Sequence, residues 1–129
     1  MRILLVQHSI ENSEAYPLGL GYVAAVLKES GHKVAFLDLA LESGDPSKTL
    51  IAWVKRHRAQ AIGFTAMTPQ YDECLDLVNR ARPSLGSIPI IMGGPHPSAL
   101  PEEVLRNGAA DIVVISEGEE IAPDLFHAL

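Results

Sequence analysis

The stretch of this chain whose residue types best suit a chemical role runs from Ile88 to Pro97, where an apolar segment ends in Gly93 and Gly94 and Pro-His-Pro follows. Glycine has no side chain, so two glycines at the end of a strand expose main chain against which a flat or bulky ligand can lie. Parallel sheets bind nucleotides and large cofactors at the carboxyl ends of their strands. A tight turn between a strand and a helix explains the same residues, and taken alone the stretch favours that simpler interpretation.

Small or hydroxyl-bearing residues follow two other apolar segments as well. Together they suit a large ligand that is held without a covalent bond, because hydroxyl and main-chain groups can supply its hydrogen bonds. A competing interpretation is that Thr65 and Thr68 only cap the helix that follows them. The residues concerned are Thr65, Ala66, Thr68, Gly93, Gly94 and Gly118.

The sequence predicts no catalytic or metal-binding constellation. Gly19 and Gly21 are two residues apart with no suitable third glycine, and the chain has neither a phosphate-binding loop nor a G-x-S-x-G nucleophile. His8 and His96 follow predicted strands on one edge and could form a ligand pair, but we favour polar loop residues. Cys74 falls on the apolar stripe of a predicted helix and is interpreted as a core residue. A single cysteine excludes an internal disulfide or iron–sulfur site.

The composition is that of an ordinary globular domain. The 129 residues are enough for one domain and too few for two, and 47% are apolar and 20% charged. No apolar run suits a membrane span or a secretory signal, so a reducing, cytoplasmic setting is expected. The net charge of -6 argues against a nucleic-acid groove. The basic run at Lys55–Arg58 is expected to be the solvated last turn of a helix.

Five short apolar segments predict the strands that position these residues. Continuous apolar runs are typical of strands buried on both faces of a parallel sheet, and segments of helical periodicity separate them. We therefore predict an α/β fold with one doubly wound, five-stranded parallel sheet over residues 1–129. Its ligand should lie at the carboxyl edge of the sheet. The predicted strands are Ile3–Val6, Val34–Leu37, Ala61–Ala66, Ile88–Met92 and Asp111–Ile115.

Cap and breaker residues predict the bounds of the central helices. Asp45 and Pro46 predict the start of the second helix, because aspartate is a good N-cap and proline suits the first helical position. The pair Thr68-Pro69 repeats that pattern for the third helix. Pro83 and Gly86 are expected to end it.

The last third of the chain predicts two more helices. One should run from Ser98 to Asn107, with Pro101 in its first turn. Glu117–Glu120 is predicted to be a loop, and Pro123 is predicted to open the final helix. That helix stops at Leu129, as expected if a longer enzyme had been cut after its first domain.

The chain resembles, over essentially all of its length, the cobalamin-binding domain at the amino end of cobalamin-dependent radical S-adenosylmethionine enzymes. The Gly-Gly-Pro-His-Pro run at 93–97 and the later Glu-Gly-Glu at 117–119 carry most of the resemblance. It implies a flavodoxin-like (Rossmann-like) strand order, with the nucleotide tail of cobalamin between the sheet and its helices. Further matching segments are Pro17–Ala24, Gly31–Val34, Ile62–Thr65 and Leu100–Glu103.

The resemblance also implies roles for individual residues. Hydroxyls after the third strand would exchange hydrogen bonds with the tail, and glycines after the fourth strand would let it approach the main chain. Gly118 and Glu119 would meet its nucleotide end. The cofactor-binding residues implied are Tyr16, Gly19, Thr65, Ala66, Thr68, Gly93, Gly94, Gly118 and Glu119, with no catalytic residue and no metal ligand.

One position departs from the pattern of cobalamin-dependent mutases and methionine synthases, in which D-x-H-x-x-G supplies a histidine ligand to cobalt. That motif falls on Glu14 to Gly19, where Tyr16 replaces the histidine. A phenol that is neutral at pH 7 is a poor cobalt ligand. The resemblance therefore implies base-off cobalamin with no histidine below the cobalt, as is common in the radical enzymes.

The radical chemistry itself needs a C-x-x-x-C-x-x-C motif, and this chain has Cys74 alone. The iron–sulfur cluster and S-adenosylmethionine are therefore expected in another part of a parent enzyme, either a methyltransferase or an oxidative cyclase. Two alternatives stay open. One is a domain of the same ancestry that has lost its cofactor and serves as an interaction or scaffold module. The other is a nucleotide-binding domain, which the missing phosphate motifs disfavour.

Overall fold

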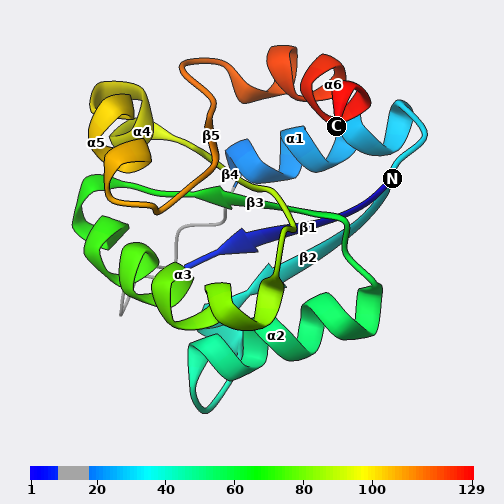
Figure 1. Cartoon of the computed structure of the whole chain (residues 1–129). Helices are drawn as coiled ribbons and strands as arrows, with labels where there is room; N and C mark the ends of the chain where they lie inside the picture. Colours follow the sequence, from blue (N-terminus) through cyan, green and yellow to red (C-terminus); the bar gives the residue numbers. More distant parts are fainter. Residues whose placement is uncertain (9–17) are drawn as a thin grey trace.

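The computed structural model of the chain describes residues 1–8 and 18–129, and Figure 1 shows how its layers are arranged. Five parallel strands form one sheet in the order β2-β1-β3-β4-β5. This is the flavodoxin-like order, so the predicted fold class is confirmed. The strands are β1 (Arg2–Gln7), β2 (Lys33–Asp38), β3 (Ala61–Thr65), β4 (Ile90–Gly93) and β5 (Ile112–Val113).

Helices cover both faces of this sheet (Figure 1). The pair α1 (Leu18–Glu29) and α6 (Gly118–Ala128) lies over one face, and the pair α2 (Pro46–His57) and α3 (Tyr71–Leu85) packs on the other. None of the helices in the described ranges has the length and apolar character that crossing a bilayer requires. The shorter elements are α4 (Pro95–Ala99), α5 (Pro101–Arg106) and the 3₁₀ turns η1 (Leu39–Leu41) and η2 (Thr68–Gln70).

The core lies on both sides of the sheet, which explains why the strands read as continuous apolar runs. In β1, Leu4 and Val6 pack into the cluster under α2 and α3, whereas Ile3 and Leu5 pack into the cluster under α1 and α6. Consecutive residues of a strand point to opposite faces, and here all four side chains are buried. Strand β1 therefore has no solvated face, as predicted.

The helix predicted over Ser98–Asn107 is wrong in its start and its continuity. The chain forms α4 and then α5, with a break at Leu100, whose φ is -133° and ψ is 57°. The ring of Pro101 disfavours helical backbone in the residue before it. The helix is therefore interrupted before Pro101, and the earlier Pro95 opens α4.

Two prolines lie inside helices, against prediction. Helix α3 continues through Pro83, and α6 contains Pro123 because it already begins at Gly118. The loop predicted at Glu117–Glu120 is therefore wrong beyond its first residue. A proline removes one main-chain hydrogen bond, but burial of an apolar helix face, such as Phe126 on the sheet, stabilises the helix more than that bond does.

Strand β5 is shorter than the predicted Asp111–Ile115. It lies at the edge of the sheet and pairs with β4 alone, through Ile112 and Val113. Soon afterwards the chain turns at Ser116, whose φ of 72° is in the left-handed region. The edge position of β5 and the turn at Ser116 therefore limit the length over which β5 pairs with β4.

Cys74 is fully buried on α3 among apolar side chains. Burial raises the pKa of its thiol to about 12, and the nearby Glu73 carboxylate adds to the effect. The thiol therefore stays protonated and poorly nucleophilic at neutral pH. The interpretation of Cys74 as a core residue is confirmed.

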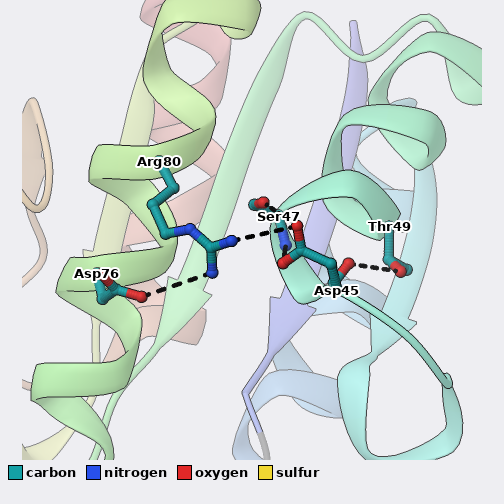
Figure 2. A network of polar contacts seen from close by, with 5 residues as sticks. All are labelled: Asp45, Ser47, Thr49, Asp76 and Arg80. Carbon is teal, nitrogen blue, oxygen red and sulfur yellow. Dashed lines mark hydrogen bonds and ion pairs between the residues drawn. The ribbon is translucent and has the colours of Figure 1, made fainter.

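Asp45 caps α2, as predicted (Figure 2). Its Oδ1 accepts a hydrogen bond from the Ser47 amide at 3.2 Å, and its Oδ2 accepts one from the Ser47 hydroxyl at 3.0 Å. Arg80 of α3 donates to the same Oδ2 at 3.2 Å and lies 3.8 Å from Asp76. The hydroxyl of Ser47 is the main cause that lowers the pKa of Asp45. The cap thus links the start of α2 to α3.

We expect Asp45→Ala to lower the melting temperature by a few degrees at pH 7, because the first turn of α2 loses its cap. Asp45→Asn is the matched control, since asparagine also caps helices and should restore most of the loss. The pKa of Asp45 is lowered in the fold, so its charge-dependent stabilisation is present above its unfolded-state pKa and is lost as pH falls through the folded value. Melting curves recorded from pH 7 to pH 3 should therefore converge for wild type and Asp45→Asn. A gap between them that stays constant over that range would contradict this account.

Candidate functional site

A cavity of about 490 Å³ lies between the sheet and the layer formed by α1 and α6. Strands β1, β3 and β4 and the segment after β5 form one wall, and the helix residues Leu20, Val23, Ala122 and Phe126 form the other. The lining is mostly apolar, and the cavity reaches the carboxyl edge of the strands. Its volume is within the range of roughly 300–1,000 Å³ that is typical of small-molecule and cofactor sites.

The strand side of the cavity consists of two rows of residues that the parallel register places across the sheet. In the inner row Leu5 pairs with Gly63, which pairs with Ile91. In the outer row, at the carboxyl edge, Gln7 pairs with Thr65, which pairs with Gly93. The cavity is therefore apolar inside and becomes polar at its mouth.

Gly63 is the residue of the inner row that has no side chain. A Cβ atom on Gly63 would lie 2.8 Å from Cδ2 of Leu5 and 3.9 Å from Cζ of Phe126. A side chain here would therefore crowd the centre of the cavity. Gly63 was not among the site residues predicted from the sequence, although a glycine inside an apolar strand often marks a close approach of a ligand.

Gly94 is held against the end of β3. Its φ is +105°, and a Cβ atom would lie 2.8 Å from Oγ1 of Thr65 and 2.9 Å from the main-chain oxygen of Ala66. The Ala66 amide also donates to the oxygen of Gly93 at 3.0 Å, and the His96 amide donates to the oxygen of Ala66 at 3.1 Å. The glycine is therefore required for the loop to pack on β3, and both Gly93 and Gly94 line the cavity with main chain.

The three predicted site residues at the end of β3 and just after it have different surroundings. Thr65 lines the cavity, whereas Ala66 is fully buried and, like Thr68, is not among the lining residues. The hydroxyl of Thr68 lies 3.3 Å from Nδ1 of His96. The interpretation of Thr68 as a cap of the third helix is wrong, because Gln70 occupies the N-cap position of α3 and Met67 that of η2.

The two strand-end histidines do not form a pair at the cavity. Nδ1 of His8 lies 3.2 Å from Oε2 of Glu73 on α3. His96 is only 5% exposed and stacks on Tyr71 with ring centroids 4.0 Å apart. All five histidines of the chain are in the described ranges, and none of them lines the cavity.

The helix starts supply the remaining predicted residues. Gly19 in the first turn of α1 and Gly118 and Glu119 at the start of α6 line the cavity. The pKa of Glu117 is raised, chiefly by a hydrogen bond with the side chain of Glu119 and then by its charge. The acidic pair therefore lies at this end of the cavity mouth. Tyr16 lies outside the described residues.

Gln7 is a second residue that the sequence analysis did not assign to the site. It lines the cavity at the carboxyl end of β1, the strand between β2 and β3. Its Oε1 is buried and has no hydrogen-bond partner in the described part of the chain. Buried polar side-chain atoms normally have a hydrogen-bond partner, and this one lacks it.

A family model described as the B12 binding domain matches residues 11–126 of the chain. The hopanoid C-3 methylase of Methylococcus capsulatus is 32% identical over 116 residues, which are 88% of this chain and 22% of that protein. The chain spans 22–29% of the length of the curated relatives it matches.

Solved structures of radical enzymes contain the same fold. The radical S-adenosylmethionine methyltransferase TsrM from Kitasatospora setae, with cobalamin and a 4Fe-4S cluster bound, matches with a TM-score of 0.86 and 23% identity over 98% of this chain and 24% of its own. The cobalamin-dependent S-adenosylmethionine radical enzyme OxsB with aqua-cobalamin matches with a TM-score of 0.83 and 20% identity over 98% of this chain and 18% of its own. With the family match, these findings confirm the resemblance and the cofactor that the sequence predicted.

Proposed function

Because the chain belongs to the B12-binding domain family, we propose that it holds base-off cobalamin at the carboxyl edge of the sheet, with the nucleotide tail in the cavity. The observation that carries this proposal is the cavity itself, which runs from the strand ends inward under α1 and α6. Shape and polarity support it. The interior is apolar and lacks a side chain at Gly63, and the mouth presents Gln7, Thr65 and Glu119.

The chain's residues would bind, orient and desolvate the cofactor. Main chain at Gly93 and Gly94 would form one side of the slot, and the hydroxyl of Thr65 would exchange a hydrogen bond with the tail. The apolar residues of α1 and α6 would exclude water from it. The bound corrin supplies the methyl-transfer or related chemistry.

The positions of the histidines support a state with no histidine ligand to cobalt. None of them lines the cavity, His8 pairs with Glu73, and His96 is buried against Thr68 and Tyr71. Each of the two strand-end imidazoles thus has its own protein contacts. A histidine below the cobalt is therefore not part of the proposed site.

We further propose that the chain is the cofactor module of a longer radical S-adenosylmethionine enzyme, a methyltransferase or an oxidative cyclase. The short span that it covers in its methyltransferase relatives supports this. The iron–sulfur cluster and S-adenosylmethionine would then belong to another domain of that enzyme, because Cys74 is the only cysteine of this chain.

We expect the purified 129-residue chain to retain hydroxocobalamin on a desalting column and to give a base-off visible spectrum. His8→Ala and His96→Ala should retain the cofactor with the same spectrum, because neither side chain ligates cobalt. A changed spectrum in either variant would overturn the ligand assignment. Elution of the folded wild type without corrin would overturn cobalamin binding and favour an interaction module.

A further inference from the structure

Gln7 is the polar side chain of the cavity whose bonding the fold leaves incomplete. It ends β1, the strand between β2 and β3, and its neighbours in register are Asp38 and Thr65. Its Oε1 is buried and has no hydrogen-bond partner among the described residues. An unpaired buried acceptor costs free energy, so the site is complete only when a donor reaches it.

The chemistry of a glutamine side chain restricts what that donor can be. The amide group has an acceptor oxygen and a donor nitrogen on one planar group. A primary carboxamide is complementary to both, whichever way the Gln7 amide is turned about its last bond. A carboxylate has no donor, so it would leave an acceptor of Gln7 facing an acceptor of the ligand. A hydroxyl group could satisfy only one of the two atoms at its best geometry.

We propose that Gln7 pairs with a primary carboxamide on the corrin periphery and that this pair makes the site select amidated corrins over those carrying a carboxylate at that position. The proposal rests on the proposed function, because the corrin is the source of the carboxamide. The location agrees with it. Gln7 is in the outer row at the cavity mouth, beside Thr65 and across β3 from Gly93, where the tail would leave the slot and the edge of the corrin would come within reach.

The test is a two-by-two comparison of protein and ligand. Gln7→Met keeps an unbranched side chain of similar length but removes both polar atoms. The matched control is Gln60→Met, because Gln60 is exposed and its Oε1 accepts from the Arg2 amide, outside the cavity lining. The ligands are hydroxocobalamin and its separate monocarboxylic acids, each with one carboxamide hydrolysed. Dissociation constants come from titrations followed by visible absorption, and folding is checked by thermal melting.

We expect Gln7→Met to bind hydroxocobalamin about tenfold more weakly, which corresponds to one buried hydrogen-bonded group. Gln60→Met should bind like wild type. One monocarboxylic acid should bind wild type at least about tenfold more weakly than hydroxocobalamin, and that difference should disappear in Gln7→Met, because the amide pair is already lost.

Three results would overturn the inference while leaving cobalamin binding intact. The first is a folded Gln7→Met that binds hydroxocobalamin with wild-type affinity. The second is wild type that binds every monocarboxylic acid as tightly as hydroxocobalamin. The third is a preference for hydroxocobalamin over a monocarboxylic acid that survives in Gln7→Met. The wild-type comparison decides the matter even if Gln7→Met is unstable. Failure of wild type to bind hydroxocobalamin would instead overturn the proposed function, and this inference with it.

Discussion

Gly63→Val is expected to abolish or strongly weaken cobalamin binding while leaving the fold almost unchanged. The new side chain would enter the centre of the cavity, beginning with a Cβ atom 2.8 Å from Cδ2 of Leu5. Because the valine side chain would occupy space that the cofactor needs, we expect affinity to fall by about tenfold to more than a hundredfold. The clash is with a side chain beside an open cavity, and valine suits a strand, so the melting temperature should change little.

Gly21→Val is the matched control for that experiment. Gly21 lies in α1, outside the cavity lining, and no atom approaches within 4 Å of a Cβ placed there. It should retain hydroxocobalamin on the desalting column, whereas Gly63→Val should not. Normal retention by a folded Gly63→Val would show that no part of the cofactor occupies the inner row. The cavity would then be only a packing defect between the sheet and its helices.

The sheet could be predicted because its signals are local. The runs Ile3–Val6 and Val34–Leu37 are apolar without interruption, which is typical of strands covered on both faces, and both runs do pack against the clusters on the two sides of the sheet. The Asp45 cap is equally local, since it depends on a side chain reaching an amide two residues away. Signals of this kind need no knowledge of distant partners.

The helix bounds near prolines could not be predicted, because proline is ambiguous in sequence. Pro101 breaks a helix at Leu100, whereas Pro83 and Pro123 lie inside helices. The outcome depends on how much apolar surface the helix buries on both sides of the proline. That quantity is a property of tertiary packing, as Phe126 of α6 illustrates.

The cavity residues also divide into those that could be predicted from the sequence and those that could not. Thr65, Gly93 and Gly94 were predicted because they follow strands at the carboxyl edge. Gly63 and Gln7 were missed, since their importance comes from register between strands and from the helices that cover one face. The sequence nevertheless contained a signal for Gly63. It is two residues before Thr65, so both residues lie on the same face of the sheet.

Gly94→Val is the second large effect we expect, and it should differ from Gly63→Val by costing stability as well as binding. At Gly94 the backbone has a φ of +105°, and a Cβ atom would lie 2.9 Å from the main-chain oxygen of Ala66, which cannot move aside as a side chain can. The loop would have to leave β3, breaking the bonds that join Gly93 and His96 to Ala66. We expect a loss of about 1–3 kcal/mol in stability with helical circular dichroism retained at low temperature, and no retained hydroxocobalamin.

A control for backbone strain is available in the same chain. Gly108 has a φ of +75°, yet nothing lies within 4 Å of a Cβ placed there, and it is outside the cavity lining. Gly108→Val should therefore lower the melting temperature but retain hydroxocobalamin on the desalting column. If Gly94→Val also retained the cofactor, the contact between this loop and β3 would be irrelevant to the site. Gly93 and Gly94 would then form an ordinary turn between a strand and a helix, and other residues would have to form that side of the cofactor slot.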